Sequence, residues 1–528
     1  MNGEKCRTWR QWTADVLIVA FFAVFLTFVI YAPIIKSMAN YGERCLPGEY
    51  STISIFFMSF FLLGLLAWAY FTAAHTQTRL RKYLYLPLML FLTALLLRLF
   101  VVLCMGFGTN QISDFQMAFS SAGEPIPIDL SYYKAFSNWG LYSAYLRLIT
   151  SVFGYSEFTG IIFNAILSSL SVVLLYFICA LSFRRLSVAL LASALFNFFP
   201  SHLLFTIVLS PDFVNLFLIL LAVFILCIAR RRFREKLIKK LLLYAAAGGI
   251  LGLASFFKLI DKIVFVALAI TMVIDWLSDI REKNPEIPLW KRLLNGRTAA
   301  VLLSFLCSLV VIQAGFAYLD YYVGERVNRS AMSHFLYMGL NPFGEGRWTE
   351  KTAIYVKVVE NNSFDYEKAD RVMYDRLRYE VREHQNLNFE FFDKKADTAW
   401  GDTNYLYFID STMNKEKKAA VNRWEWLMAF IPFSEAYYVM VAFLLGIGAL
   451  CALLRRERGM AFFSGLIVFG FALLLFVSEV QPRYKTVVYP YMLIVAAYGV
   501  DSVAEGIERL LPRLLKKKKA ARCFPNKI

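Results

Sequence analysis

Long, uninterrupted apolar runs constrain this sequence more than any other feature. A helix needs about 20 mostly apolar residues to cross a bilayer core about 30 Å thick, and the 528-residue chain contains many such runs. They are continuously apolar rather than alternating, which argues against a transmembrane β-barrel. Hydrophobic residues make up 59% of the sequence, whereas soluble domains hold about 45–50%. The sequence therefore predicts an all-α, polytopic membrane protein.

The apolar runs predict about twelve transmembrane helices. Pro200 and the polar stretch Ser210-Pro211-Asp212 interrupt the region of the fifth and sixth runs, so a turn is expected there. The predicted spans cover residues 14–36, 51–73, 84–104, 159–182, 186–207, 212–229, 241–258, 263–277, 299–318, 427–453, 459–477 and 486–504.

The distribution of Lys and Arg predicts the orientation of these spans. One set of alternate loops is rich in basic residues, as in the stretch from Arg230 to Lys240, and this set includes both chain ends. The positive-inside rule therefore places both termini in the cytoplasm. The formal net charge of +17 is then explained by loops that face anionic lipid, and a nucleic-acid partner is not expected.

Two long segments are expected outside the membrane. Residues 105–158 include an amphipathic stretch, 139–153, that suits a helix lying in the membrane interface. Residues 319–426 form a polar insert, in which 366–385 shows helical spacing of apolar residues. The expected organisation is 1–83, N-terminal spans; 84–318, transmembrane core with the external loop 105–158; 319–426, a small and largely helical external insert; 427–504, C-terminal spans; and 505–528, a basic cytoplasmic tail.

Several polar side chains fall on the predicted external side at membrane level. Charges near a bilayer are costly, so such residues are candidates for a functional site. They are Asp114, Asp212, Lys258, Asp261, Lys262, Glu479, Arg483, Tyr484 and Lys485.

Six stretches, in this order, resemble one family of membrane enzymes. They are SDF at Asp114, FGYSE at 153–157, NFFPSHLLFTIVLSPD at 197–212, AAAGGILGLASFFK at 245–258, DKKADTAWGD at 393–402 and QPRYKTVVYPYMLIVAAYG at 481–499. Together they resemble the C-type (GT-C) membrane glycosyltransferases, in the branch of protein O-mannosyltransferases and lipid A aminoarabinose transferases. The resemblance covers most of the chain beyond residue 84. Two features depart from the family pattern: Asp114 follows the third span rather than the first, and Ser137-Asn138-Trp139-Gly140 stands where a Pro-Pro pair is frequent.

The resemblance implies transfer of a sugar from a polyprenyl-phosphate donor on the outer face of the membrane. Asp114 would then be the general base, and attack on the far side of the sugar would invert the anomeric centre. Arg483 would bind the donor phosphate through its planar guanidinium, with Tyr484, Lys258, Lys262 and Lys485 as further donor-phosphate ligands. The acceptor stays open among protein, lipid and glycan.

Two carboxylates have open roles under this resemblance. Asp212 could orient the acceptor, bind the sugar or assist a metal, and Glu479 could hold Arg483 or bind a cation. No cofactor is assigned, and a divalent ion held by Asp114, Asp212 and Glu479 stays an open alternative.

Each assignment has a simpler structural alternative. Asp114 could be a solvated loop residue, Asp212 could cap the following helix, and Arg483 and Lys485 could be interfacial anchors. Two other functions also fit external charges, namely a transporter or flippase of lipid-linked sugars and a cell-envelope glycan polymerase or ligase. The lack of internal repeats and of polar residues at mid-membrane favours the transferase over the transporter.

Overall fold

The computed structural model describes the chain in ten stretches, and within them every regular element is a helix. The described residues are 9–44, 82–105, 111–124, 130–183, 185–232, 236–258, 260–279, 296–384, 387–401 and 423–522. The expected all-α class is confirmed across these stretches. The predicted span 51–73 lies outside the described residues.

Eight helices in the described stretches are long and apolar enough to cross a membrane, and a bent pair raises the number to nine. This agrees with the expected multi-pass membrane protein. Two further predicted spans, 263–277 and 486–504, are also helical, as α13 and α24, without being among the eight. The helices that carry the spans, including the bent pair, are α1 (Trp9–Val29), α4 (Lys82–Met105), α8 (Glu157–Ser182), α9 (Leu186–Asn197), α10 (Pro200–Leu204), α11 (Asp212–Arg232), α12 (Leu237–Ser255), α13 (Asp261–Asp279), α15 (Gly296–Val323), α22 (Arg423–Arg455), α23 (Met460–Val477) and α24 (Tyr489–Arg522).

The turn expected near Pro200 is present. Helix α9 and the segment Pro200–Ile207, which combines α10 with the short 3-10 helix η2 (Phe205–Ile207), are inclined by 53° to one another. Proline occupies the first position of α10, where its missing N–H group costs no hydrogen bond. Helix α11 then begins at Asp212, so the break delivers that carboxylate to the start of a span.

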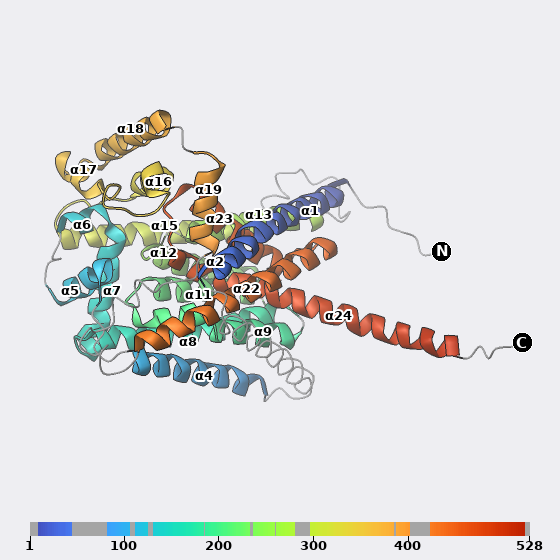
Figure 1. Ribbon diagram of the computed structural model, residues 1–528. Helices are drawn as coiled ribbons and strands as arrows, with labels where there is room; N and C mark the ends of the chain where they lie inside the picture. The colour runs from blue at the N-terminus through green and yellow to red at the C-terminus, as the bar shows by residue number, and fades with distance from the viewer. Residues whose placement is uncertain are drawn as a thin grey trace, which may run out of the picture.

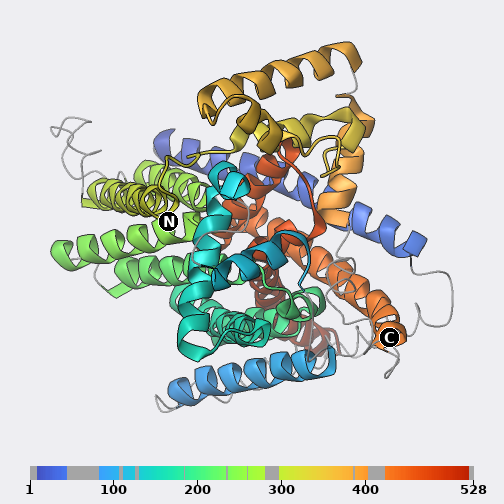
Figure 2. The ribbon, with the colours of Figure 1, turned by 90° about the vertical axis from the view of Figure 1, so that its left-hand side faces the viewer.

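Short helices gather at one end of the bundle of long helices (Figure 1). Helices α5, α6 and α7 cross this end in front of the long helices in Figure 2, and α16 to α19 stack above them. Helix α1 begins and α24 ends on the opposite side (Figure 1). The bounds are α5 (Ser113–Gly123), α6 (Leu130–Ala135), α7 (Ser137–Phe153), α16 (Met332–Leu340), the 3-10 helix η3 (Pro342–Gly344), α17 (Tyr355–Asn361), α18 (Tyr366–His384) and α19 (Phe389–Ala396).

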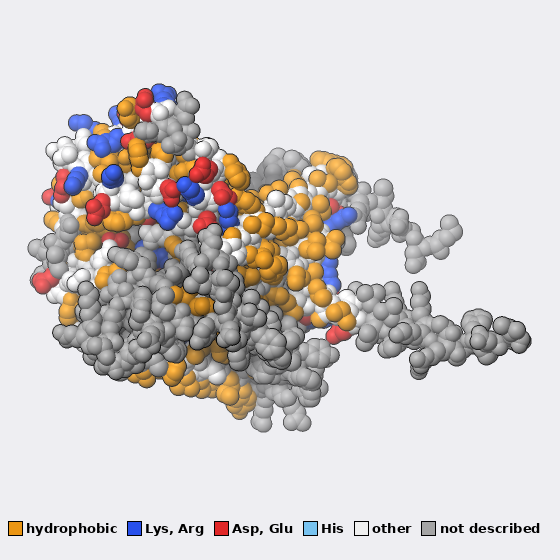
Figure 3. Space-filling view, in the orientation of Figure 1, with side chains coloured by type: hydrophobic (Ala, Val, Ile, Leu, Met, Phe, Trp, Pro, Cys, Tyr) orange, Lys and Arg blue, Asp and Glu red, His pale blue; other side chains and the backbone are white. Residues whose placement is uncertain are grey.

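Two helices expected from amphipathic spacing are confirmed as helices. Helix α7 contains the predicted stretch 139–153; it buries Tyr142 and Leu146 and exposes Leu148 and Val152. Helix α18 coincides with the predicted stretch 366–385 apart from its last residue. Charged side chains are spread over the insert, whereas the neighbouring surface of the long helices is mostly hydrophobic (Figure 3).

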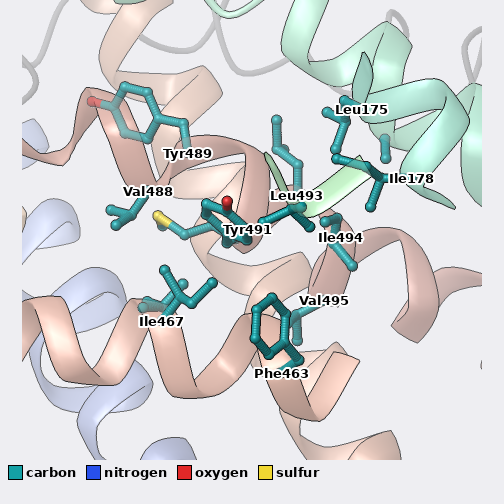
Figure 4. Close-up of a cluster of buried hydrophobic side chains, with 14 of the residues drawn as sticks. Leu175, Ile178, Phe463, Ile467, Val488, Tyr489, Tyr491, Leu493, Ile494 and Val495 are labelled. Atoms are coloured by element: carbon teal, nitrogen blue, oxygen red, sulfur yellow. The ribbon is translucent and has the colours of Figure 1, made fainter. Parts of the chain in front are cut away.

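The hydrophobic core is centred on the first turns of α24. Figure 4 shows Tyr491, Leu493, Ile494 and Val495 of α24 packed between α8 and α23, and each of these four residues is at most 1% exposed. Lipid tails are as apolar as leucine, so tight packing rather than escape from water stabilises such contacts. Helix α24 begins directly after the 3-10 helix η5 (Pro482–Val488), which carries Arg483 and Tyr484.

The first long helix has a π-helical end that contacts the insert. The π-helix η1 (Ile30–Lys36) contains Pro33 and leads into α2 (Ser37–Arg44). It packs against a second π-helix, η4 (Asp397–Gly401), which follows α19. The insert is thereby connected to the transmembrane part near the chain's beginning as well as at its own two ends.

Candidate active site

Asp114 stands at the beginning of α5, on the end of the molecule where the short helices gather. The preceding residue, Ser113, has a φ of 53°, an unfavourable value for a non-glycine residue that is often found beside functional groups. The Tyr132 hydroxyl donates a hydrogen bond of 3.0 Å to Asp114 Oδ1. Burial raises the pKa of the Asp114 carboxyl, and the positive charge of Arg483 and the Tyr132 hydrogen bond oppose this rise. A half-buried carboxyl with a raised pKa is suited to accept a proton.

Arg483 reaches the same place from residues 478–488, which form the hairpin between α23 and α24. Its guanidinium carbon lies 4.9 Å from the centroid of the Phe115 ring, on the residue next to Asp114, and 5.3 Å from that of Tyr484. Its side chain is only 7% exposed although it remains a permanent cation. The structure therefore brings together Asp114 and Arg483, which are far apart in the sequence.

Glu479 and Gln481 organise this hairpin. Gln481 donates to Glu479 Oε1 at 2.6 Å and accepts from Arg483 Nε at 2.7 Å, and the Tyr484 hydroxyl donates to Glu479 Oε2 at 2.9 Å. Glu479 is 4% exposed. Burial raises the pKa of its carboxyl, the charge of Asp114 adds to this rise, and its hydrogen-bond donors and Arg483 oppose it. Side-chain hydrogen bonds within the hairpin thus hold the Arg483 guanidinium in position.

Asp212 and Lys258 form an ion pair beside the hairpin. Lys258 follows the end of α12, and its ammonium nitrogen contacts Asp212 Oδ1 and lies 4.6 Å from the centroid of the Tyr484 ring. Ser210 donates a 2.6 Å hydrogen bond to Asp212 Oδ2 and accepts one from the Asp212 backbone amide. The serine therefore caps the start of α11, and the Asp212 carboxylate faces Lys258. Tyr484 lies against both cations, Lys258 and Arg483.

Two expected phosphate ligands lie elsewhere. Lys262 is exposed on the second residue of α13, next to Asp261. Lys485 is fully buried; its amine donates to the Ala399 carbonyl at 3.0 Å and lies 4.7 Å from the centroid of the Tyr438 ring. The structure thus groups Asp114, Asp212, Lys258, Glu479, Arg483 and Tyr484, without Lys262 or the amine of Lys485.

The three grouped carboxylates do not make a metal site. Within the described residues, no three His, Cys, Asp or Glu side chains come close enough together to hold a metal ion. Each carboxylate is instead engaged by a tyrosine, glutamine, serine or lysine of the chain. We therefore derive no step through a metal.

Two members of this site were not expected from the sequence. Tyr132 lies on the short helix α6, and nothing in its sequence pattern separates it from Tyr133, whose hydroxyl donates to the Met117 carbonyl instead. Gln481 lies between Glu479 and Arg483, and its position within so short a charged hairpin is a signal that could have identified it.

One family model matches the central part of the chain. Residues 141–287 match the family described as dolichyl-phosphate-mannose-protein mannosyltransferase. The resemblance to C-type membrane glycosyltransferases is confirmed. The mannosyltransferase match includes α8 to α13, and with them Asp212 and Lys258. No curated protein matches the chain.

Solved structures of an archaeal oligosaccharyltransferase are also similar to this chain. The apo form of the Archaeoglobus fulgidus oligosaccharyltransferase is 11% identical, with a TM-score of 0.42, over 84% of this chain and 53% of its own. AglB from Archaeoglobus fulgidus, in complex with an inhibitory peptide and a dolichol-phosphate, is 13% identical, with a TM-score of 0.40, over 85% of this chain and 53% of its own. The present chain therefore spans about half the length of these structures.

Proposed function

We propose that the protein transfers a sugar from a polyprenyl-phosphate donor to an acceptor on the outer face of the membrane. The observation that carries this proposal is the meeting of Asp114 with Arg483 at one end of the helix bundle. A carboxyl with a raised pKa beside a buried guanidinium supplies the two groups that this reaction needs. The mannosyltransferase family match supports a lipid-phosphate donor.

The reaction is a displacement at the anomeric carbon. The acceptor hydroxyl attacks that carbon, the bond from carbon to the phosphate oxygen breaks, and the hydroxyl proton passes to the Asp114 carboxylate. The sugar is inverted because the base and the leaving group lie on opposite faces of the ring. General-base catalysis of this type contributes about 10²–10⁴-fold.

The phosphate departs as an anion and needs cations rather than an acid. Arg483 can contact two of its oxygens at once, and Lys258, whose ammonium lies 4.6 Å from the centroid of the Tyr484 ring, is a second positive charge beside it. Because Asp212 already pairs with Lys258, we assign Asp212 to holding that lysine in place. Glu479 acts in the same way on the hairpin, through Gln481 and Tyr484.

Mass spectrometry of envelope material from cells with and without the protein tests this proposal. A product that is heavier by one sugar and present only with the protein is expected, and its identity would define the acceptor. Reconstituted membranes should also release polyprenyl phosphate in step with the product. Movement of lipid-linked sugar across the membrane without either change would instead establish a flippase.

A further inference from the structure

Lys395 is a buried lysine outside the group that faces the proposed donor. It lies on α19 of the insert and is 2% exposed. Its ammonium nitrogen donates to three backbone carbonyls: Gly339 at 2.5 Å, Phe476 at 3.1 Å and Ser478 at 2.9 Å. An ammonium group has three N–H donors, so these carbonyls use all of them.

Two of the three carbonyls, those of Phe476 and Ser478, lie where the hairpin leaves α23, and the third, that of Gly339, lies in the last turn of α16. The last carbonyls of a helix have no partner within it, and a cation at this end is favoured by the helix dipole. The surroundings leave little room for movement. A Cβ atom on Gly339 would lie 2.2 Å from the Ser478 carbonyl carbon, and one on Gly346, whose φ is +76°, would lie 2.6 Å from Cδ of Lys395.

The insert also holds the hairpin through its backbone. The amide of Glu479 donates to the Phe335 carbonyl at 3.1 Å, and that of Val480 donates to the Gly346 carbonyl at 2.9 Å. At the far end of the hairpin, Lys485 donates to the Ala399 carbonyl in η4. The segment that carries Glu479 and Arg483 is therefore fixed at one end by Lys395 of α19 together with Phe335 and Gly346, and at the other end by Ala399 of η4.

The α19–η4 segment is itself anchored on the transmembrane part. Lys36 of η1 pairs with Asp393 at 2.6 Å, and Asn40 of α2 donates to Asp397 at 2.9 Å. These contacts give the segment a fixed place from which it can hold the hairpin. An insert that moved freely could not do so.

We infer that the α19–η4 segment positions the hairpin for sugar transfer and that Lys395 is its main positioning residue. This inference rests on the proposed function for its catalytic consequence, but not for its structural one. Lys395 acts through the Ser478 carbonyl and the segment next to Glu479, and does not contact the donor. Without its ammonium group the end of α23 loses two hydrogen bonds and the last turn of α16 loses one, and the placement of Glu479 and Arg483 relaxes.

The environment of Lys395 makes this contact sensitive to protonation. Burial lowers the pKa of Lys395 to about 7, and the charge of Glu479 opposes the shift. A neutral amine has only two N–H donors, so loss of the proton leaves one of the three carbonyls without its bond.

Comparison of Lys395→Met with Lys394→Met tests the inference. Lys394 is the matched control, because it lies on the same helix but is partly exposed and pairs with Glu345 and Glu390. In hydrogen exchange, the amides of Glu479 and Val480 should exchange about tenfold faster in Lys395→Met, since bonds to a charged group are lost. They should be unchanged in Lys394→Met. Equal exchange in the two variants would overturn the inference, whatever reaction the protein catalyses.

The catalytic consequence is measured with a double variant. The test is whether the loss of kcat from Lys395→Met adds to the loss from a substitution in the hairpin. Lys395→Met should lower kcat about tenfold in the wild-type background and have little further effect in Glu479→Gln, because both changes act on one unit. Losses that simply add would contradict a positioning role. If Lys395→Met does not accumulate, Lys395→Gln, which keeps two N–H donors, is measured with the same readouts and the same two outcomes. A wild-type protein that transfers no sugar refutes the proposed function alone, and the exchange experiment still decides this inference.

Discussion

Two acid–base pairs of this protein show how burial changes the contribution of an ion pair to stability. Asp212 and Lys258 pair at the candidate site, where their side chains are 0% and 20% exposed. Asp375 and Arg378 pair on α18, where theirs are 73% and 72% exposed. In the first pair each charge depends on its partner for stabilisation, because little water reaches the two groups. In the second pair, water solvates both charges, and the pair contributes little.

The same contrast separates the carboxylates. Asp114 is half buried, and its pKa is raised by burial, whereas Asp375 is a surface residue of the insert. Carboxylates of the same chemical type thus lie in two different environments, one largely shielded from water and one solvated. Exposed residues of α18 are therefore matched controls for buried residues of the candidate site.

The largest expected effect follows from Asp114→Asn. An amide cannot accept the acceptor's proton, so transfer should fall by about 10²–10⁴-fold. Asp375→Asn should leave transfer unchanged, because that side chain is 73% exposed on α18 and pairs with Arg378. Initial rates in reconstituted membranes measure both variants. Similar rates for Asp114→Asn and the wild type would remove the general base from the mechanism.

The next effect concerns the buried pair. Lys258→Met should lower the free energy of unfolding by about 3–5 kcal/mol, because it leaves the Asp212 carboxylate buried without its cation. The double variant with Asp212→Asn should recover part of this loss. Thermal unfolding in detergent measures the three proteins. A double variant that is less stable than Lys258→Met would show that the pair is not the coupled unit described here.

A smaller effect is expected on the pH dependence of transfer. The Asp114 base must be ionised, so transfer should be lost as pH falls through its pKa, which lies above the usual value of about 3.9. Tyr132→Phe removes a hydrogen bond that lowers this pKa, and the acidic limb of kcat/KM should therefore move to higher pH. Tyr379→Phe, an exposed position on α18, should leave the limb in place. An acidic limb that moves to lower pH in Tyr132→Phe would contradict the assignment.

The stability effect of the same carboxyl has the opposite sign. A folded-state pKa raised above the unfolded value means that the folded protein holds the proton more tightly. The contribution of Asp114 to stability is therefore present at low pH and is lost as pH rises through the raised pKa. Activity and stability should change in opposite directions across this range.

The smallest effect belongs to the exposed pair. Replacing Arg378 by Met should change the free energy of unfolding by only about 0–1 kcal/mol, because both partners remain solvated. Thermal unfolding under the conditions used for Lys258→Met gives a direct comparison. A loss for Arg378→Met as large as that for Lys258→Met would break the contrast between buried and exposed pairs.

Local features of this fold could be predicted from the sequence because they depend on neighbouring residues. Apolar runs predicted the helical class, Pro200 predicted a break, and amphipathic spacing predicted α7 and α18. The contact between the π-helices η1 and η4 could not be predicted in this way. It joins segments more than 350 residues apart, so no local pattern records it.

The sequence likewise identified some residues of the candidate site but could not predict their contacts. The cost of placing charges near a bilayer identified Asp114, Asp212, Glu479 and Arg483 as candidates. The sequence could not distinguish Lys258, whose ammonium lies beside Tyr484, from Lys485, whose ammonium contacts the Ala399 carbonyl. Such differences depend on the direction in which each side chain leaves the backbone.

Binding of polyprenyl phosphate to Asp114→Asn and Arg483→Gln tests the central claim most directly. That claim is that a base and a phosphate-binding cation act on the same lipid-carried sugar. The account predicts that Asp114→Asn binds this lipid as the wild type does while transferring sugar poorly, and that Arg483→Gln binds it about tenfold more weakly or worse, as expected when a charge-assisted contact is lost. Unchanged binding by Arg483→Gln would contradict the account.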